Sequence, residues 1–132
     1  MNRLIQGLAA AAAVALTASV AFAAPSNNTR APCFFITQWQ GWKSPSPKVL
    51  YLGVNMHDVY RVDLAAETPM LGDPSVHLVS EVRGSDSICS ALDLRLTVAD
   101  DMGAMREPLF PEKLTKLTPE EVAAIPRKFR PN

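Results

Sequence analysis

"KVLYLGVNMHDVYRVDL", residues 48–64, contains an apolar run with β-branched and aromatic side chains and then a run of alternating apolar and polar side chains, with a short polar segment between them. In the second run, every other residue from Tyr60 to Leu64 is apolar. A period of two is typical of a strand that is buried on one face only. Between the runs, Asn55–Asp58 has the composition of a four-residue hairpin loop. The stretch therefore predicts two antiparallel strands, 48–54 and 59–64.

Three further segments show strand character. Residues 33–37 are mainly apolar, and 76–82 are rich in β-branched side chains. The clearest alternation lies in 92–98, where Leu92, Leu94, Leu96 and Val98 are expected to share a buried face. Strands buried on one face belong to antiparallel sheets. We therefore expect a mainly β fold, a small antiparallel barrel or sandwich of about five strands.

The C-terminal part carries the signals of a short helix. Thr118 is a suitable N-cap, Pro119 suits the first helical position and Glu121 completes a capping box. Pro126 ends the helix after about two turns. The remaining residues, 127–132, form a basic tail that we expect to be mobile.

The N-terminal part has the pattern of a secretory signal peptide over residues 1–23. Arg3 precedes an apolar run, and Ala21-Phe22-Ala23 supplies the small-x-small cleavage pattern. A retained membrane anchor is the alternative, but the run is mostly alanine and no cations follow it directly. We expect cleavage, which leaves no stable membrane anchor and places the chain in the bacterial periplasm or outside the cell. A flexible leader, 24–32, then precedes a single domain, 33–126.

The charge balance bears on the class of partner. The chain has 13 Lys and Arg against 13 Asp and Glu. Proteins that bind nucleic acids need a cluster of excess cations to displace phosphate counterions. We therefore expect no nucleic-acid partner.

The chain has two cysteines, Cys33 and Cys89. A lipid anchor on Cys33 is disfavoured because the expected cleavage site lies ten residues upstream. No C-x-x-C redox motif is present, and a catalytic cysteine would need one of only two histidines. Two cysteines in a small exported domain most often pair with each other. We therefore expect a Cys33–Cys89 disulfide.

The candidate chemical sites are few. Met56, His57, Met102 and Met105 are soft or borderline ligands of the kind that Cu(I) prefers, although methionines also fill gaps in small cores. His57 beside Asp58 could serve as an acid–base pair, but a polar hairpin tip is the favoured interpretation. No Gly-x-Ser-x-Gly elbow or phosphate-binding glycine loop occurs. We expect no catalytic residues and no cofactor.

Two segments are candidates for an interaction surface. Trp39 and Trp42 could offer aromatic platforms to a glycan, or could pack beside the disulfide. In a regular strand these two positions would face opposite sides, with one exposed. The basic tail could dock onto a protein or an anionic surface. Its candidate residues are Arg127, Lys128, Phe129 and Arg130.

The order of these features resembles a family of small exported bacterial proteins of unknown function. The resemblance rests most specifically on the closing run LTPEEVAAIP, Leu117–Pro126. Members often carry a second cysteine pair, whose neighbourhoods here read Thr68-Pro69-Met70 and Pro108-Leu109-Phe110. The joint absence of that pair agrees with Cys33–Cys89 as the remaining bond. The resemblance implies no ligand and no site.

From the sequence we predict an exported, monomeric, non-enzymatic protein that binds an unknown protein or envelope component, or has a structural role in the envelope. A copper-binding protein of the periplasm is the second hypothesis, and a hydrolase is the third.

Overall fold

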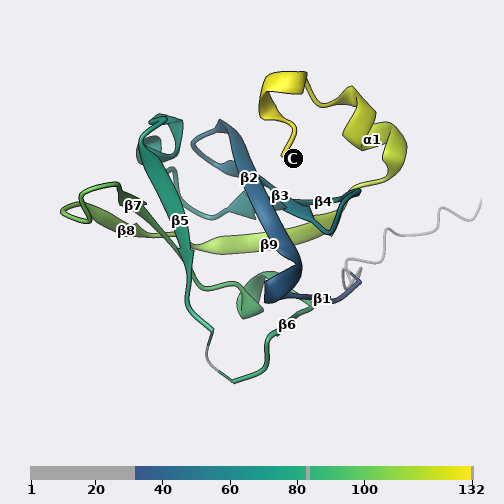
Figure 1. Ribbon diagram of the computed structural model, residues 1–132, viewed down its shortest axis with the longest axis horizontal. Helices are drawn as coiled ribbons and strands as arrows, with labels where there is room; N and C mark the ends of the chain where they lie inside the picture. Colours follow the sequence, from purple (N-terminus) through teal and green to yellow (C-terminus); the bar gives the residue numbers. More distant parts are fainter. Residues whose placement is uncertain (1–31, 83, 132) are drawn as a thin grey trace, which may run out of the picture.

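The computed structural model describes residues 32–82 and 84–131, which form three antiparallel sheets around one core (Figure 1). The mainly β class, the single disulfide and the short C-terminal helix are confirmed. Of the two predicted architectures, a barrel or a sandwich, the closed barrel is not formed, because the three sheets do not close on each other. The expected signal peptide and the leader up to residue 31 lie outside the described residues.

The largest sheet has four strands in the order β2-β3-β4-β9. The predicted hairpin forms its centre, with β3 at Val49–Val54 and β4 at Asp58–Leu64. Asp58 pairs with Val54, so the loop has three residues rather than the expected four. Asn55 begins this loop at a φ of 52°, a left-handed conformation that asparagine tolerates better than most residues.

The second sheet has the order β5-β7-β8, with β5 at Val76–Ser80, β7 at Leu96–Asp100 and β8 at Arg106–Pro108. The predicted strand 92–98 therefore begins four residues late. Its first part is the 3-10 turn η3, Ala91–Asp93.

The carboxylate of Asp93 explains the late start of β7. It accepts hydrogen bonds from the backbone N–H groups of Cys89 and Ser90, which favours a turn over an extended strand. Leu92 is consequently 87% exposed, so its predicted burial is wrong, whereas Leu94, Leu96 and Val98 are buried as expected.

The smallest sheet pairs β1, Phe34–Phe35, with β6, Ser87–Ile88. The predicted strand 33–37 is thus shortened, because the 3-10 turn η1 occupies Ile36–Gln38. The Cys33–Cys89 disulfide adjoins this pair with a Cα–Cα distance of 4.1 Å. The Phe34 ring packs on the buried Tyr60 at 4.6 Å, so the small sheet is joined to the core of the large one.

Four strands were not predicted: β2 (Trp39–Ser46), β6, β8 and β9 (Pro111–Lys116). Pro45 lies within β2, and β9 begins at Pro111. Proline is tolerated on edge strands, where its missing N–H leaves no ladder bond unmade. Both β2 and β9 are edges of their sheet, which explains why prolines that argue against strands in the sequence are accommodated.

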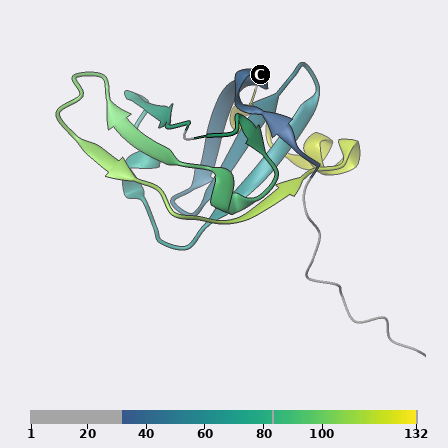
Figure 2. The same cartoon turned by 90° about the horizontal axis from the view of Figure 1, so that it is seen from below.

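One extended segment links the two larger sheets. Leu109, which follows β8, donates its N–H to Leu96 of the second sheet. The next carbonyl, on Phe110, accepts from Ala65 beside β4 of the first sheet. Figure 2 shows this segment, β8 to β9, running from one sheet into the other. A strand that changes sheets is a common way to form the corner of two packed sheets.

The core receives side chains from all three sheets. Its buried members are Phe34, Leu50, Leu52, Val54, Tyr60, Val62, Leu64, Leu71, Ile88, Ala91, Leu94, Leu96, Val98, Leu109 and Leu114. A second 3-10 turn, η2 (Pro69–Gly72), contributes Leu71. Within the described ranges, no helix is both long and apolar enough to cross a membrane.

The predicted helix start is confirmed in α1, Pro119–Ala124. Thr118 Oγ1 accepts from the Glu121 N–H at 3.3 Å, and the Glu121 carboxylate accepts from the Thr118 N–H at 2.8 Å. The chain then forms a last 3-10 turn, η4, at Arg127–Phe129. In Figure 1, η4 lies near β2, and the two elements are in contact.

Candidate binding site

A groove runs between the edge strand β2, the end of η2, the start of β5 and the C-terminal turn η4. We call it the tail groove. Its volume is about 460 Å³, within the range of small-molecule sites. It is lined by Trp42, Lys43, Ser44, Leu71, Gly72, Asp73, Pro74, Val76, Lys128 and Phe129. Three residues predicted as interaction candidates from distant parts of the sequence, Trp42, Lys128 and Phe129, therefore meet in one place.

The backbone of β2 determines which tryptophan reaches the groove. Trp39 pairs with Val54, but Gly41 pairs with Gly53, so Gln40 is an extra residue in the ladder. Such a bulge shifts the alternation by one position. Trp39 and Trp42 therefore both pack against the core, and the prediction that they face opposite sides is wrong.

The two indoles differ in their hydrogen bonds. Trp39 Nε1 donates to the Gly41 carbonyl at 2.8 Å, the local bond expected of a packing tryptophan. The indole N–H of Trp42 has no partner among the residues that the structure describes. Trp42 lines the tail groove, and its indole N–H is not among the buried unpaired groups of the described residues, so a ligand can reach this donor.

The groove has two cations and one anion. The ion pairs of the described residues include neither Lys43 nor Lys128. The Lys128 ammonium lies 4.7 Å from the centre of the Phe129 ring. Cations bind favourably over aromatic faces. Asp73 Oδ1 accepts bonds from the Ser75 hydroxyl and N–H, which hold the pKa of Asp73 below its usual value. The carboxylate is therefore charged at neutral pH, and the groove has a net positive charge.

The tail that forms one wall of the groove is folded back onto the domain. Arg130 Nη2 donates to the Ala123 carbonyl at 3.0 Å and to the Ile125 carbonyl at 2.9 Å. Ile125 and Pro131 are buried. The structure thus differs from the expected mobile tail, because the guanidinium of Arg130 binds carbonyl groups that the end of α1 leaves unpaired.

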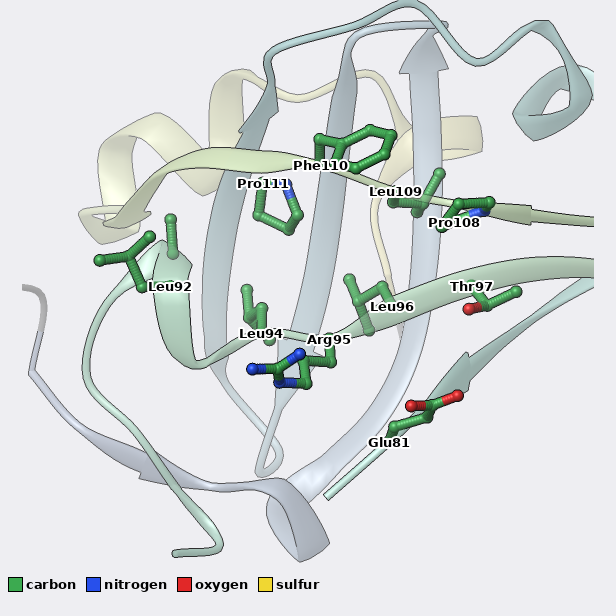
Figure 3. A pocket seen from close by; sticks show the side chains of 11 residues that line it. Glu81, Leu92, Leu94, Arg95, Leu96, Thr97, Pro108, Leu109, Phe110 and Pro111 are labelled. Carbon is green, nitrogen blue, oxygen red and sulfur yellow. The ribbon is translucent and has the colours of Figure 1, made fainter. Parts of the chain in front are cut away.

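A second groove lies between η3 and the segment that joins β8 to β9, and we call it the Phe110 groove. Figure 3 shows Phe110 and Pro111 on one side, facing Leu94, Leu96 and Arg95. Its volume is about 410 Å³, and Phe110 at its rim is 59% exposed. Its described lining contains no histidine, cysteine or serine. No pattern in the sequence predicts this groove, since its apolar rim depends on the late start of β7.

The four copper-ligand candidates occupy two separate hairpins. Met56 and His57 lie in the β3–β4 loop, whereas Met102 and Met105 both lie in the β7–β8 connection. These two hairpins point to opposite ends of the molecule in Figures 1 and 2. Met56 is 79% exposed and Met102 is 89% exposed. The fold therefore does not assemble the four into one ligand set.

The remaining titratable pairs have structural explanations. Asp58, beside His57, forms an ion pair with Lys116 at 3.0 Å. His77 Nδ1 lies 3.8 Å from Asp101 Oδ1 on an exposed surface. In residues 32–82 and 84–131, no three His, Cys, Asp or Glu side chains are grouped as metal ligands would be.

Sequence reasoning identified Trp42, Lys128 and Phe129 but missed Lys43 and Asp73. No local pattern marks these two residues, because their role depends on the position of β2 beside η2 and η4. Comparison of the chain with protein-family models, with characterised proteins and with solved structures finds no match.

Proposed function

We propose that the chain is an exported, non-enzymatic binding protein of the cell envelope, and that it binds an anionic partner in the tail groove. The observation that carries this proposal is the convergence of Trp42, Phe129, Lys43 and Lys128 on one concave surface. Binding sites combine aromatic walls with a small number of placed polar groups in this way.

The envelope location is supported by two features. The N-terminal residues have the pattern of a secretory signal, and the only two cysteines are joined in a disulfide. Stable structural disulfides are typical of oxidising compartments such as the periplasm or the extracellular space. We also propose that the chain is a member of the exported bacterial family that it resembles, on the basis of the closing run Leu117–Pro126.

Binding is favoured over catalysis by the lining of the groove. Its hydroxyl group, on Ser44, donates to the backbone carbonyls of Ser46 and Val49, and the described lining contains no histidine to act as its base. A nucleophile requires such a base within hydrogen-bond reach. The groove therefore has the groups to hold an anion but lacks an activated nucleophile.

Site-specific photocrosslinking in cells tests the proposal. A benzophenone amino acid replaces Phe129 in the tail groove or, as the matched control, Phe35, which is 56% exposed on β1. We expect a discrete adduct with an envelope component from position 129 and none from position 35. Equal labelling from both positions, or no adduct from position 129, would contradict the tail groove as the binding site.

A further inference from the structure

The groups in the tail groove define the chemistry of its ligand more narrowly than charge alone. Trp42 and Phe129 offer apolar aromatic surface, and the Trp42 N–H offers an unused donor. Flat aromatic side chains with a polar edge suit ligands that have one apolar face and a polar rim. A pyranose ring has such a shape, because its axial C–H groups form an apolar face and its hydroxyl groups form the rim.

The charges select among sugars. Lys43 and Lys128 lack carboxylate partners within the described residues, so each can pair with a carboxylate of a ligand. Asp73 is charged, and only its Oδ1 accepts the bonds from Ser75. Its Oδ2 atom is available to accept from a ligand hydroxyl group. A neutral sugar would leave both lysines without a partner. An anionic ligand without hydroxyl groups would place its own negative charge beside the Asp73 carboxylate and offer that carboxylate no hydrogen-bond donor.

We propose that the ligand of the tail groove is an acidic polysaccharide whose repeating sugars carry both a carboxylate and free hydroxyl groups. This proposal rests on the tail groove being the binding site. The sugar faces pack on Trp42 and Phe129. Lys43 and Lys128 bind the uronate carboxylates, and Asp73 accepts from a hydroxyl group. A peptide made of Asp and Glu alone satisfies the lysines equally well, but it has no donor for Asp73 except its backbone.

The test uses the full exported protein with its disulfide formed and records the two indole N–H signals by NMR. The probes are hexasaccharides of galacturonate, mannuronate and hyaluronan, with neutral maltohexaose and hexaglutamate as comparisons. We expect at least one acidic hexasaccharide to shift the Trp42 indole signal and to leave the Trp39 signal in place, because the Trp39 N–H is bonded to Gly41. Maltohexaose should shift neither signal.

Variants separate the charge from the hydroxyl recognition. Lys128→Gln should weaken binding of the acidic hexasaccharide about threefold to fivefold, the range of one partly exposed ion pair. Lys113→Gln removes the same charge from β9, outside the groove, and should leave binding unchanged. Asp73→Asn should weaken the hexasaccharide about threefold by losing a charge-assisted hydrogen bond. The same variant should strengthen the binding of hexaglutamate, because it removes a negative charge that repels this ligand.

Each outcome has a defined meaning. Hexaglutamate could shift the Trp42 indole signal, with binding weakened by Lys128→Gln, while no acidic hexasaccharide shifts that signal. In that case the groove stays a binding site for anions, and the polysaccharide proposal is overturned. If no probe moves the Trp42 signal, both the polysaccharide and the anionic groove are overturned. If Lys113→Gln weakens binding as much as Lys128→Gln, the attraction is general to the surface and the proposal also fails.

Discussion

At the scale of single residues, one inserted position decides how two similar side chains are used. Gln40 forms the bulge that turns Trp39 and Trp42 to the same face of β2. Trp39 then bonds to its own strand, and Trp42 extends to the tail groove with its N–H unpaired by the described residues. The residue types were recognisable in the sequence, but a bulge leaves no signature in it, so the alternation rule gave the wrong faces.

A first prediction concerns Ser75, which donates two hydrogen bonds to the Asp73 carboxylate. These bonds favour the charged form, so Ser75→Ala should raise the pKa of Asp73 toward its ordinary value. Because the pKa is depressed in the folded chain, this carboxylate stabilises the fold above its unfolded-state pKa. That contribution to stability disappears as the pH falls through the pKa that Asp73 has in the folded state. A carboxyl carbon NMR titration measures the change. Ser46→Ala, which leaves Asp73 untouched, is the control, and an unmoved Asp73 titration in Ser75→Ala would refute the assignment.

At the scale of elements, the C-terminal unit combines a helix start that is encoded locally with a helix end that is not. The capping box at Thr118 and Glu121 could be predicted because every group in it lies within four residues. The end of α1 depends on Arg130, which lies beyond Pro126 and returns to bind the Ala123 and Ile125 carbonyls. A helix of this length is marginal without such tertiary support.

The second prediction follows from that return. Arg130→Ala should lower the free energy of unfolding by about 1–2 kcal/mol, since it removes two hydrogen bonds from a charged donor at a partly exposed site. Urea denaturation followed by fluorescence measures the loss. Arg127→Ala is the matched control because Arg127 is exposed, and it should change stability little. Equal effects of the two variants would mean that Arg130 does not anchor the tail.

The elements whose bounds were predicted closely are those with local signals, namely the strands β3, β4 and β5 and the helix α1. The two unpredicted edge strands β2 and β9 carry prolines, and proline argues against a strand unless its edge position is known. The start of β7 was misplaced because Leu92 fits the apolar alternation, whereas the Asp93 carboxylate forms a turn there.

At the scale of the whole molecule, the three sheets share one core, and the disulfide joins their N-terminal strand to β6. The pairing of Cys33 with Cys89 was predictable, because no other cysteine is available to either. The tail groove was not. Its walls come from β2, η2 and η4, and their proximity follows only from the complete fold.

The third prediction is that the double variant Cys33→Ala/Cys89→Ala loses about 4 kcal/mol of stability, from the loop-closure entropy of a 56-position separation. Urea unfolding with and without reductant measures this loss, and reductant should destabilise the parent protein but leave the double variant unchanged. In the parent, alkylation before reduction should add no mass. Two alkylated thiols at that stage would exclude the disulfide.

The segment that runs from β8 into β9 makes the backbone at Leu109 and Phe110 common to both large sheets. New chain termini opened there by circular permutation would leave β8 paired with β7 and β9 paired with β4. They would cut the covalent link between the two sheets and loosen the bonds of Leu109 to Leu96 and of Phe110 to Ala65. The same operation at the tip of the β7–β8 hairpin, beside the exposed Met102, would spare every sheet pairing. Permutants opened at that tip should therefore keep the stability of the parent protein, and those opened at Leu109 should be less stable.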